Sequence, residues 1–312
     1  MPFPWALPVA EDAFGEAATV VIGGQRVDLL LPVRGTEQRS LVEPPSRAVL
    51  DPRVVREIRV GGLPDPIPWG WAQTIKGRGG QVGAVRASLL VTRTTGELRR
   101  APEMEALAVH FPAWFSIVRG WLIAWTRSLP PVTGVVDRNA CLLAMDGDRV
   151  TGVGASINVF HSEAARDASW KEVRSALQRA SRGEQLPIEH ELLQSSDAAI
   201  MQRDCRRAVI DAATAAEVSL SKAVSSVLLT RGTPRPFIDR AIKHANGLMG
   251  VLDLYRSLGG QSSRSKNQVQ TSLAERRNDA AHGGHVPSDQ EARLALQIAR
   301  DLVIAASPLP SA

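Results

Sequence analysis

RRAVIDAATAAEVSL, residues Arg206–Leu220, is the stretch that decides the fold of the C-terminal half of the chain. It is rich in Ala, Val, Leu and Ile, and alanine has the highest intrinsic helix propensity. Ser196 and Asp197 precede it, and the short polar side chain of either residue can cap the first turn of a helix. We therefore expect one long helix that begins at Ser196 or Asp197 and runs through Leu229.

The helical pattern continues from there to the end of the chain. After an interruption by two prolines in Thr233–Pro236, three further helices are expected, at Phe237–Leu258, Ser265–Ala281 and Asp289–Ile304. Gly283-Gly284 follow the third of these helices, in a position typical of a C-terminal cap. Ser288 and Glu291 have the spacing of a capping box at the start of the fourth. Four helices with short connections predict an all-α bundle over residues 191–312.

The first half of the chain has the character of strands. Strands are expected at Ala17–Ile22, Val27–Pro32, Ala87–Thr92, Ala140–Met145 and Gly154–Phe160. Gly23-Gly24 fits a hairpin turn, and Asp146–Asp148 fits a tight turn between the last two strands. The apolar positions of Glu103–Arg127 recur at helical spacing. We expect an α+β domain over residues 1–165, in the role of a sensor or targeting domain.

A helical connector is expected between the two domains, over residues 166–190. Asp167–Ser181 has the pattern of an amphipathic helix, with Trp170, Val173 and Leu177 on one face. Glycine and proline then break the pattern before the second domain begins.

All seven tryptophans precede residue 171. Trp114, Trp121 and Trp125 recur at helical spacing, which is typical of a face that packs into a core. Trp69-Gly70-Trp71 stands beside Lys76–Gly80, and this loop of aromatic, basic and glycine residues is a candidate contact with nucleic acid or a partner. A surface loop without binding function is the alternative.

The composition is that of a globular protein with room for two domains. Of the 312 residues, 44% are hydrophobic and 22% are charged, which excludes a disordered chain. The pI of about 9.7 and the formal net charge of +5 permit a polyanionic partner without requiring one. Cys141 and Cys205 lie far apart and outside any Cys-x-x-Cys pair, which argues against a disulfide framework and a cysteine-based zinc site.

No segment of the chain has the pattern of a targeting or membrane-spanning sequence. Met1–Trp5 lacks the basic and apolar regions of a signal peptide. Phe111–Leu129 is the longest apolar run, but Arg119, Gly120 and Arg127 interrupt it, so we expect a buried helix. A cytoplasmic protein without a membrane partner is therefore expected.

The residues best equipped for chemistry are RNDAAHGG, Arg277–Gly284, at the end of the third expected helix. They join a fixed cation, an amide, a carboxylate and a titratable imidazole within about one and a half helical turns. These group types can cleave a phosphodiester without a metal ion.

The spacing Arg277-x4-His282, with the polar Asn278 directly after the arginine and a final helix beyond, resembles the HEPN family (higher eukaryotes and prokaryotes nucleotide-binding). Arg206–Leu220 also resembles the first core helix of such domains, and the resemblance covers about residues 191–305. It implies a HEPN-like four-helix bundle without metal or other cofactor, RNA as the partner, and a homodimer in which two copies of the motif meet. Similar proteins are toxins or antiviral defence effectors, so an antitoxin or regulatory ligand is a further expected partner.

The expected reaction is attack of a 2′-hydroxyl on the adjacent phosphate of RNA. One His282 removes the hydroxyl proton, and a second, from the partner copy, protonates the leaving 5′-oxygen. Arg277 holds the phosphate and stabilises charge on its oxygens, while Asn278 positions the phosphate or orients the imidazole. Asp279 supports the cationic form of the imidazole. Glu217, mid-helix among apolar residues, either orients Arg277 across the bundle or ends a structural salt bridge.

Helix geometry adds a condition to this mechanism. Asn278 and His282 are four residues apart and share a face, whereas Arg277 lies about 140° away from His282. Arg277 must therefore reach round the helix or come from a partner chain. Arg276 and His285 are candidate RNA contacts beside the motif, although a solvated arginine and a loop histidine are the plainer interpretations.

Two other functions remain open from the sequence. The first is a non-catalytic HEPN-like module that dimerises and binds nucleotide or RNA, and the second is a structural or regulatory protein whose N-terminal half carries the function. An arginine and a histidine near a helix C-terminus also form an ordinary solvated helix end that suits the helix dipole.

Overall fold

The structure is a computed structural model in which the chain forms two compact units, Met1–Gln185 and Leu186–Ser311. It describes residues 9–31, 33–34, 42–43, 71–73, 81–83, 88–90, 102–127, 132–137, 141–146, 149–154, 157–161 and 166–312. The expected contact loop at Trp69-Gly70 and Lys76–Gly80 lies outside these residues, and Trp71 begins a short strand.

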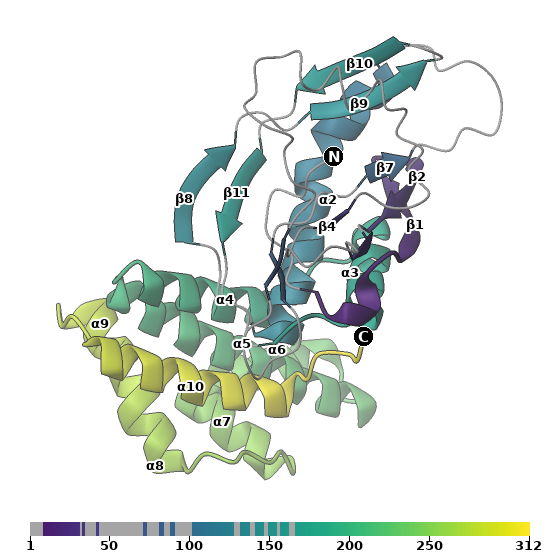
Figure 1. Cartoon of the computed structure of the whole chain (residues 1–312). Coiled ribbons are helices and arrows are strands. Elements are labelled where there is room, and N and C mark those ends of the chain that lie inside the picture. The colour runs from purple at the N-terminus through teal and green to yellow at the C-terminus, as the bar shows by residue number, and fades with distance from the viewer. Residues whose placement is uncertain are drawn as a thin grey trace. The chain divides into compact units, whose positions relative to one another are not determined.

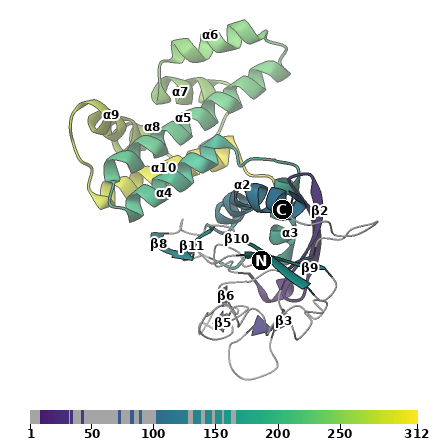
Figure 2. The ribbon, with the colours of Figure 1, turned by 90° about the horizontal axis from the view of Figure 1, so that it is seen from above.

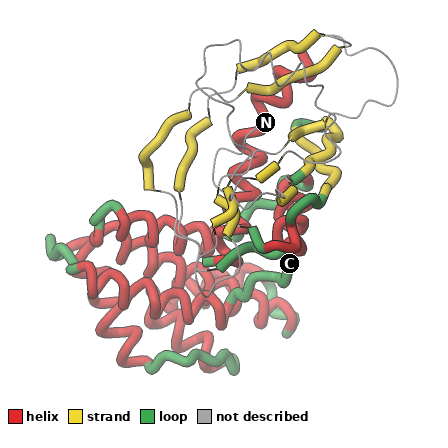
Figure 3. The backbone as a smooth tube through the Cα atoms, in the orientation of Figure 1, coloured by secondary structure: helices red, strands yellow, loops and turns green. Residues whose placement is uncertain are grey.

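The N-terminal unit contains antiparallel strands, drawn in yellow in Figure 3. They are β1 (Ala17–Ile22), β2 (Gln25–Leu30), β3 (Val33–Arg34), β4 (Val42–Glu43), β5 (Trp71–Gln73), β6 (Gln81–Gly83), β7 (Ser88–Leu90), β8 (Val132–Asp137), β9 (Cys141–Asp146), β10 (Arg149–Gly154) and β11 (Ile157–His161). Among the described residues β1, β2 and β7 form a three-stranded sheet, and the others pair as β3–β4, β5–β6, β8–β11 and β9–β10. Each expected strand segment contains a strand, with different bounds. The strand after Asp146 is β10, which ends at Gly154, so the expected strand from Gly154 to Phe160 begins only at Ile157. The sequence did not indicate β10 because glycines at positions 152 and 154 weaken its pattern.

Two helices cover the three-stranded sheet. They are α2 (Pro102–Thr126) and α3 (Trp170–Ser181), and a short 3-10 turn, η1 (Glu11–Ala13), precedes the first strand. Alternate residues of β1 and β2, including Val20 and Leu29, are buried, and both helices contact β1. Trp114 and Trp121 are buried as expected of a core face, and the Trp121 Nε1 donates to the carbonyl of Glu184 at 2.9 Å. The expected connector helix is α3, and it packs within the N-terminal unit.

The C-terminal unit is helical throughout, and all of its residues are described. Its helices are α4 (Ile188–Met201), α5 (Cys205–Thr230), α6 (Arg235–Ala245), α7 (Leu248–Ser257), α8 (Lys266–Val269), η2 (Gln270–Ala274), α9 (Glu275–His282) and α10 (Asp289–Ala306). α5 runs through the middle of the unit and contacts α4, α10, α6, α7 and α9 (Figures 1 and 2). Buried alanines on α5, such as Ala212 and Ala216, permit the close approach of these neighbours.

The expected start of the long helix was wrong. Ser196 and Asp197 lie inside α4, and α5 begins only at Cys205. Its N-cap is Asp204, whose side chain accepts a hydrogen bond from the backbone N–H of Arg207 at 3.1 Å. Arg203 breaks the helix because it adopts a left-handed conformation with φ of 60°. Instead of capping, the Ser196 hydroxyl donates to the carbonyl of Ala208 at 2.8 Å and joins α4 to α5.

The second expected helix, Phe237–Leu258, is two helices in the structure. Asn246 and Gly247 separate α6 from α7, with φ of 52° and 86°. At the start of α7 a Cβ on Gly250 would lie 1.5 Å from the carbonyl oxygen of Ala245, so only glycine fits there.

The third helix, Lys266–His282, is continuous but irregular. α8 leads into the π-helical turn η2, and α9 follows directly. It ends as expected at Gly283 and Gly284, the latter with φ of 67°. The capping box at Ser288 and Glu291 is also confirmed, because the side chain of each residue bonds the backbone N–H of the other.

α5 is long and apolar enough to cross a membrane by length and composition alone. The core helix of a folded domain has the same composition, and here α5 packs one face against α4 and α10.

Candidate functional site

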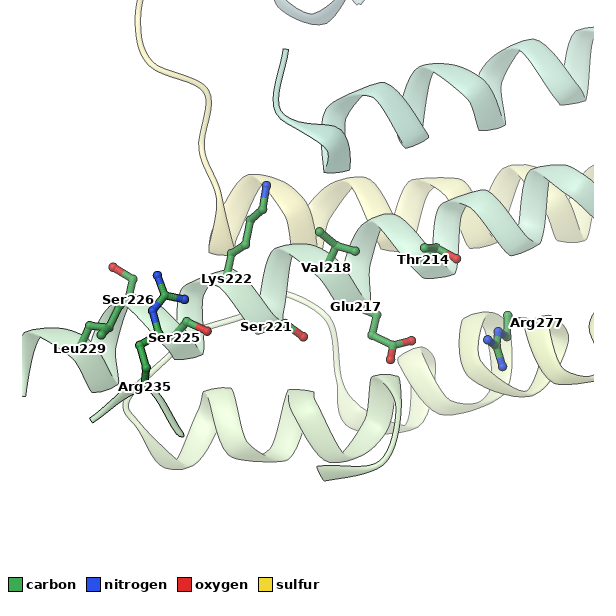
Figure 4. A pocket seen from close by; sticks show the side chains of 10 residues that line it. All are labelled: Thr214, Glu217, Val218, Ser221, Lys222, Ser225, Ser226, Leu229, Arg235 and Arg277. Carbon is green, nitrogen blue, oxygen red and sulfur yellow. The ribbon is translucent and has the colours of Figure 1, made fainter. Parts of the chain in front are cut away.

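A groove with a volume of about 670 Å³ runs along α5 in the C-terminal unit. We call it the α5 groove, and Figure 4 shows its lining side chains. They come mainly from α5, with one arginine from α6 and one from α9: Thr214, Glu217, Val218, Ser221, Lys222, Ser225, Ser226, Leu229, Arg235 and Arg277.

The groove follows from the side-chain pattern of α5. Thr214, Val218, Ser221 and Ser225 recur at spacings of three and four residues, which places them on one face of the helix. Short hydroxyl side chains fill little of the space between α5 and its neighbours, so a hollow remains. The alanine face of the same helix packs into the core.

Arg277 brings a positive charge to one end of the α5 groove. It is partly buried, and its Nη1 donates to Asn278 Oδ1 at 3.1 Å. Among the described residues no carboxylate lies within 4.0 Å of its guanidinium. Glu217 lines the same groove and points to the side of α5 on which Arg277 lies (Figure 4), but no ion pair joins the two. The structure thus places both expected residues on the same groove, but they do not form an ion pair with each other.

Arg276, the neighbour of Arg277 in sequence, does not line the groove and is paired with acidic residues instead. Its Nε lies 3.2 Å from Glu291 Oε1, and its Nη1 lies 3.9 Å from Asp279 Oδ2. His285 Nε2 lies 3.8 Å from the other oxygen of Glu291. Hydrogen bonds from Ser288 lower the pKa of Glu291, and the nearby charges of Arg276 and His285 lower it further. Arg276 therefore joins the first turn of α9 to the start of α10, His285 lies in the loop between the two helices beside the same carboxylate, and Asp279 faces Arg276.

His282 is the last residue of α9 and is exposed to solvent. It does not line the α5 groove, and no described residue hydrogen-bonds its imidazole. Asn278 is exposed as well and contacts Arg277. The expected divergence of Arg277 and His282 is thus present in the folded chain, since one lines the groove and the other does not.

Three contributors to this region were missed by the sequence reasoning. Arg235, the first residue of α6, lines the groove, and no described residue pairs with its guanidinium. Ser221 and Ser225 line the groove between Arg235 and Glu217. Only the helical spacing of the serines could have indicated them, and nothing in the sequence places Arg235 beside α5.

Lys222, at the edge of the groove, belongs to a polar cluster around the buried carboxylate of Glu189. Lys222 turns away from Glu217 and Ser221 (Figure 4), and its Nζ lies 2.5 Å from Glu189 Oε2. The Ser307 hydroxyl donates to Glu189 Oε1 at 2.6 Å. Burial raises the pKa of Glu189, but the hydrogen bonds from Lys222 and Ser307 outweigh it and leave that pKa lowered. This cluster ties the start of α4 to the end of α10, and it uses the charge of Lys222.

Among the described residues no group of three or more His, Cys, Asp or Glu side chains is placed to hold a metal ion. Comparison of the chain with models of known protein families, with curated proteins and with solved structures finds no match.

Proposed function

We propose that the C-terminal unit is a metal-independent endoribonuclease of the HEPN-like four-helix type, which works as a homodimer in the cytoplasm. The observation that carries this proposal is the state of Arg277. Its guanidinium lines a groove, lacks a carboxylate partner among the described residues, and stands five residues before an exposed imidazole. A toxin or antiviral effector that cleaves RNA is the biological role proposed, with the N-terminal unit as its sensor or targeting part.

An unpaired guanidinium in a groove suits a phosphate. Its planar fork of N–H donors matches two phosphate oxygens, and such charge-assisted bonds strengthen as negative charge builds on the phosphate. Arg277 would bind the scissile phosphate, and Asn278, held by Arg277, would fix the orientation of the fork. By contrast, the charge of Arg276 is already balanced by Glu291.

The proton transfers are assigned to His282. The imidazole removes the proton of the 2′-hydroxyl as that oxygen attacks phosphorus, and a second imidazole gives a proton to the leaving 5′-oxygen. The products are a 2′,3′-cyclic phosphate and a 5′-hydroxyl. Because His282 lies outside the groove that contains Arg277 of its own chain, the proposal requires the imidazole of a second copy across a two-fold axis.

One observation favours the alternative, a non-catalytic RNA-binding and dimerisation module. A catalytic histidine is usually oriented by a third group. Asp279, the expected support, faces Arg276, and among the described residues none hydrogen-bonds His282.

The test is RNA cleavage by the full chain in the presence of EDTA. We expect the parent to cleave and His282→Ala to lose cleavage, while the control His244→Ala, an exposed histidine on α6, keeps it. Equal cleavage by the parent and His282→Ala, or cleavage that EDTA abolishes, would overturn the proposal. RNA binding without cleavage by the parent would favour the alternative module.

A mixing experiment tests the two-fold site separately. If each site takes Arg277 from one chain and the imidazole that removes the 2′-hydroxyl proton from the other, a mixture of Arg277→Gln and His282→Ala chains contains heterodimers in which one site keeps both of these groups. Water must then protonate the leaving 5′-oxygen in place of the second imidazole, so we expect the mixture to regain part of the parent's activity, which neither variant has alone. A mixture as inactive as its components would place both residues in one chain's site.

A further inference from the structure

The α5 groove carries its charged groups in a defined order along the helix. Arg277 lies at the end marked by Thr214 and Glu217, and Arg235 lies at the end marked by Ser225 (Figure 4). Among the described residues neither arginine has a carboxylate within 4.0 Å. Two cations without acidic partners therefore mark the ends of one continuous groove.

The separation of the two ends sets the size of the ligand. Glu217 and Ser225 are eight residues apart and Thr214 and Ser225 are eleven, which corresponds to about 12–16 Å at about 1.5 Å per residue. One phosphate cannot bridge that distance. A stacked nucleic-acid strand advances about 3.4 Å per nucleotide, so roughly three to five nucleotides separate phosphates placed at the two arginines.

Glu217 restricts what lies between those phosphates. A carboxylate repels phosphate oxygens but accepts hydrogen bonds, and ribose offers a 2′-hydroxyl that DNA lacks. Ser221 and Ser225, next along the groove, can donate to or accept from the same hydroxyls. An unbroken polyanion such as an inorganic polyphosphate would meet the carboxylate unfavourably, whereas sugars and bases would not.

We infer that the α5 groove binds a single-stranded segment of RNA, with one phosphate at Arg277, a second at Arg235 and the 2′-hydroxyls between them on Glu217, Ser221 and Ser225. The choice of RNA rests on the proposed function. What is added is a binding site that extends away from the cleavage point, with Arg235 as its far contact and Glu217 as the group that distinguishes RNA from DNA.

The experiment measures binding in the His282→Ala background, so that the RNA stays intact. Fluorescence anisotropy compares single-stranded RNAs of about three and about ten nucleotides over a range of salt concentrations. Arg235→Gln is compared with Arg240→Gln, an exposed arginine of α6 that does not line the groove. Far-UV circular dichroism verifies that both variants fold.

For the longer RNA we expect Arg235→Gln to weaken binding about tenfold or more, as loss of a charge-assisted phosphate contact does. The slope of log affinity against log salt should fall by about 0.7, the value for one phosphate contact in a single strand. The shorter RNA should bind Arg235→Gln and Arg240→Gln alike. Glu217→Gln should remove the preference for RNA over DNA of the same sequence.

The inference falls if Arg235→Gln weakens the short and the long RNA equally, or binds both as Arg240→Gln does. It falls also if the parent background binds single-stranded DNA as well as RNA. These outcomes are distinct from failure of the proposed function. If Arg235→Gln weakens only the longer RNA but the parent never cleaves RNA, the RNA-binding groove is supported and the nuclease function is refuted. If the parent cleaves RNA but Arg235→Gln has no such length-dependent effect, the nuclease function is supported and the RNA-binding groove is refuted.

Discussion

Replacement of Arg276 and of Arg277 by glutamine should have opposite consequences, although the two residues are adjacent. Arg277 has no carboxylate partner among the described residues, so Arg277→Gln should change the free energy of unfolding by less than about 0.5 kcal/mol. The substitution should instead weaken the binding of RNA. A hydrogen bond to a charged group is worth about 1.5–3 kcal/mol, which corresponds to a roughly 10- to 100-fold loss of affinity.

Arg276→Gln removes the contacts with Glu291 and Asp279. The Arg276 side chain is 39% exposed, so its ion pairs are screened and worth about 0.2–1 kcal/mol. We expect a small decrease in Tm with little change in RNA affinity.

The two quantities are measured by thermal melts followed by far-UV circular dichroism and by anisotropy titrations with single-stranded RNA in EDTA. Circular dichroism is the suitable probe because all seven tryptophans precede residue 171 and therefore report on the N-terminal unit. If Arg276→Gln weakens RNA binding more than Arg277→Gln, or if Arg277→Gln melts early while its affinity is unchanged, the assignment of the two arginines is refuted.

Three further predictions concern the stability of the C-terminal unit. Burial lowers the pKa of His190 below its usual value of about 6.5, so below that pH the unfolded chain binds a proton that the folded chain does not, and stability is lost as pH falls from about 6.5 through the folded pKa. His190→Gln should therefore lose less Tm than the parent between about pH 7 and pH 5. Gly250→Ala should cost about 1–3 kcal/mol, because its methyl group would overlap the carbonyl of Ala245, and an unchanged Tm would contradict that close approach. Asp204→Ala should cost about 0.5–2 kcal/mol through loss of the N-cap of α5, while Asp204→Ser should recover most of it; equal melts for the two would rule out the cap.

The elements that the sequence predicted well are those with local causes. The capping box at Ser288 and Glu291 and the helix end at Gly283-Gly284 depend on a few adjacent residues, and both were found at the expected positions. The hairpin at Gly23-Gly24 is of the same kind. In each case the chemistry of the turn is contained in the turn itself.

The helix breaks that the sequence missed have tertiary causes. Arg203 is left-handed although it is not glycine, and the turn that it makes is held by α4 packing on α5. Nothing in the residues Asn246-Gly247 alone distinguishes them from other polar surface positions. The break there depends on the close approach of the Ala245 carbonyl to Gly250, which only the folded structure shows.

The candidate site also contains both features that the sequence predicted and features that depend on tertiary contacts. Helical periodicity was sufficient to place Arg277 and His282 on different faces, as the structure also has them. It could not show that Arg276, and not Arg277, meets Glu291, because that contact crosses from α9 to α10. It also could not bring Arg235 to α5, since the position of α6 depends on packing between elements distant in sequence.

The most direct test of the proposed function is the chemistry of the RNA ends that the full chain produces in EDTA. Mass spectrometry of the fragments should find 2′,3′-cyclic phosphate and 5′-hydroxyl ends with the parent, and an RNA that carries 2′-O-methyl groups throughout should remain intact. Ends with a 3′-hydroxyl and a 5′-phosphate, or cleavage of the methylated RNA, would contradict attack by the 2′-hydroxyl and with it the role assigned to His282.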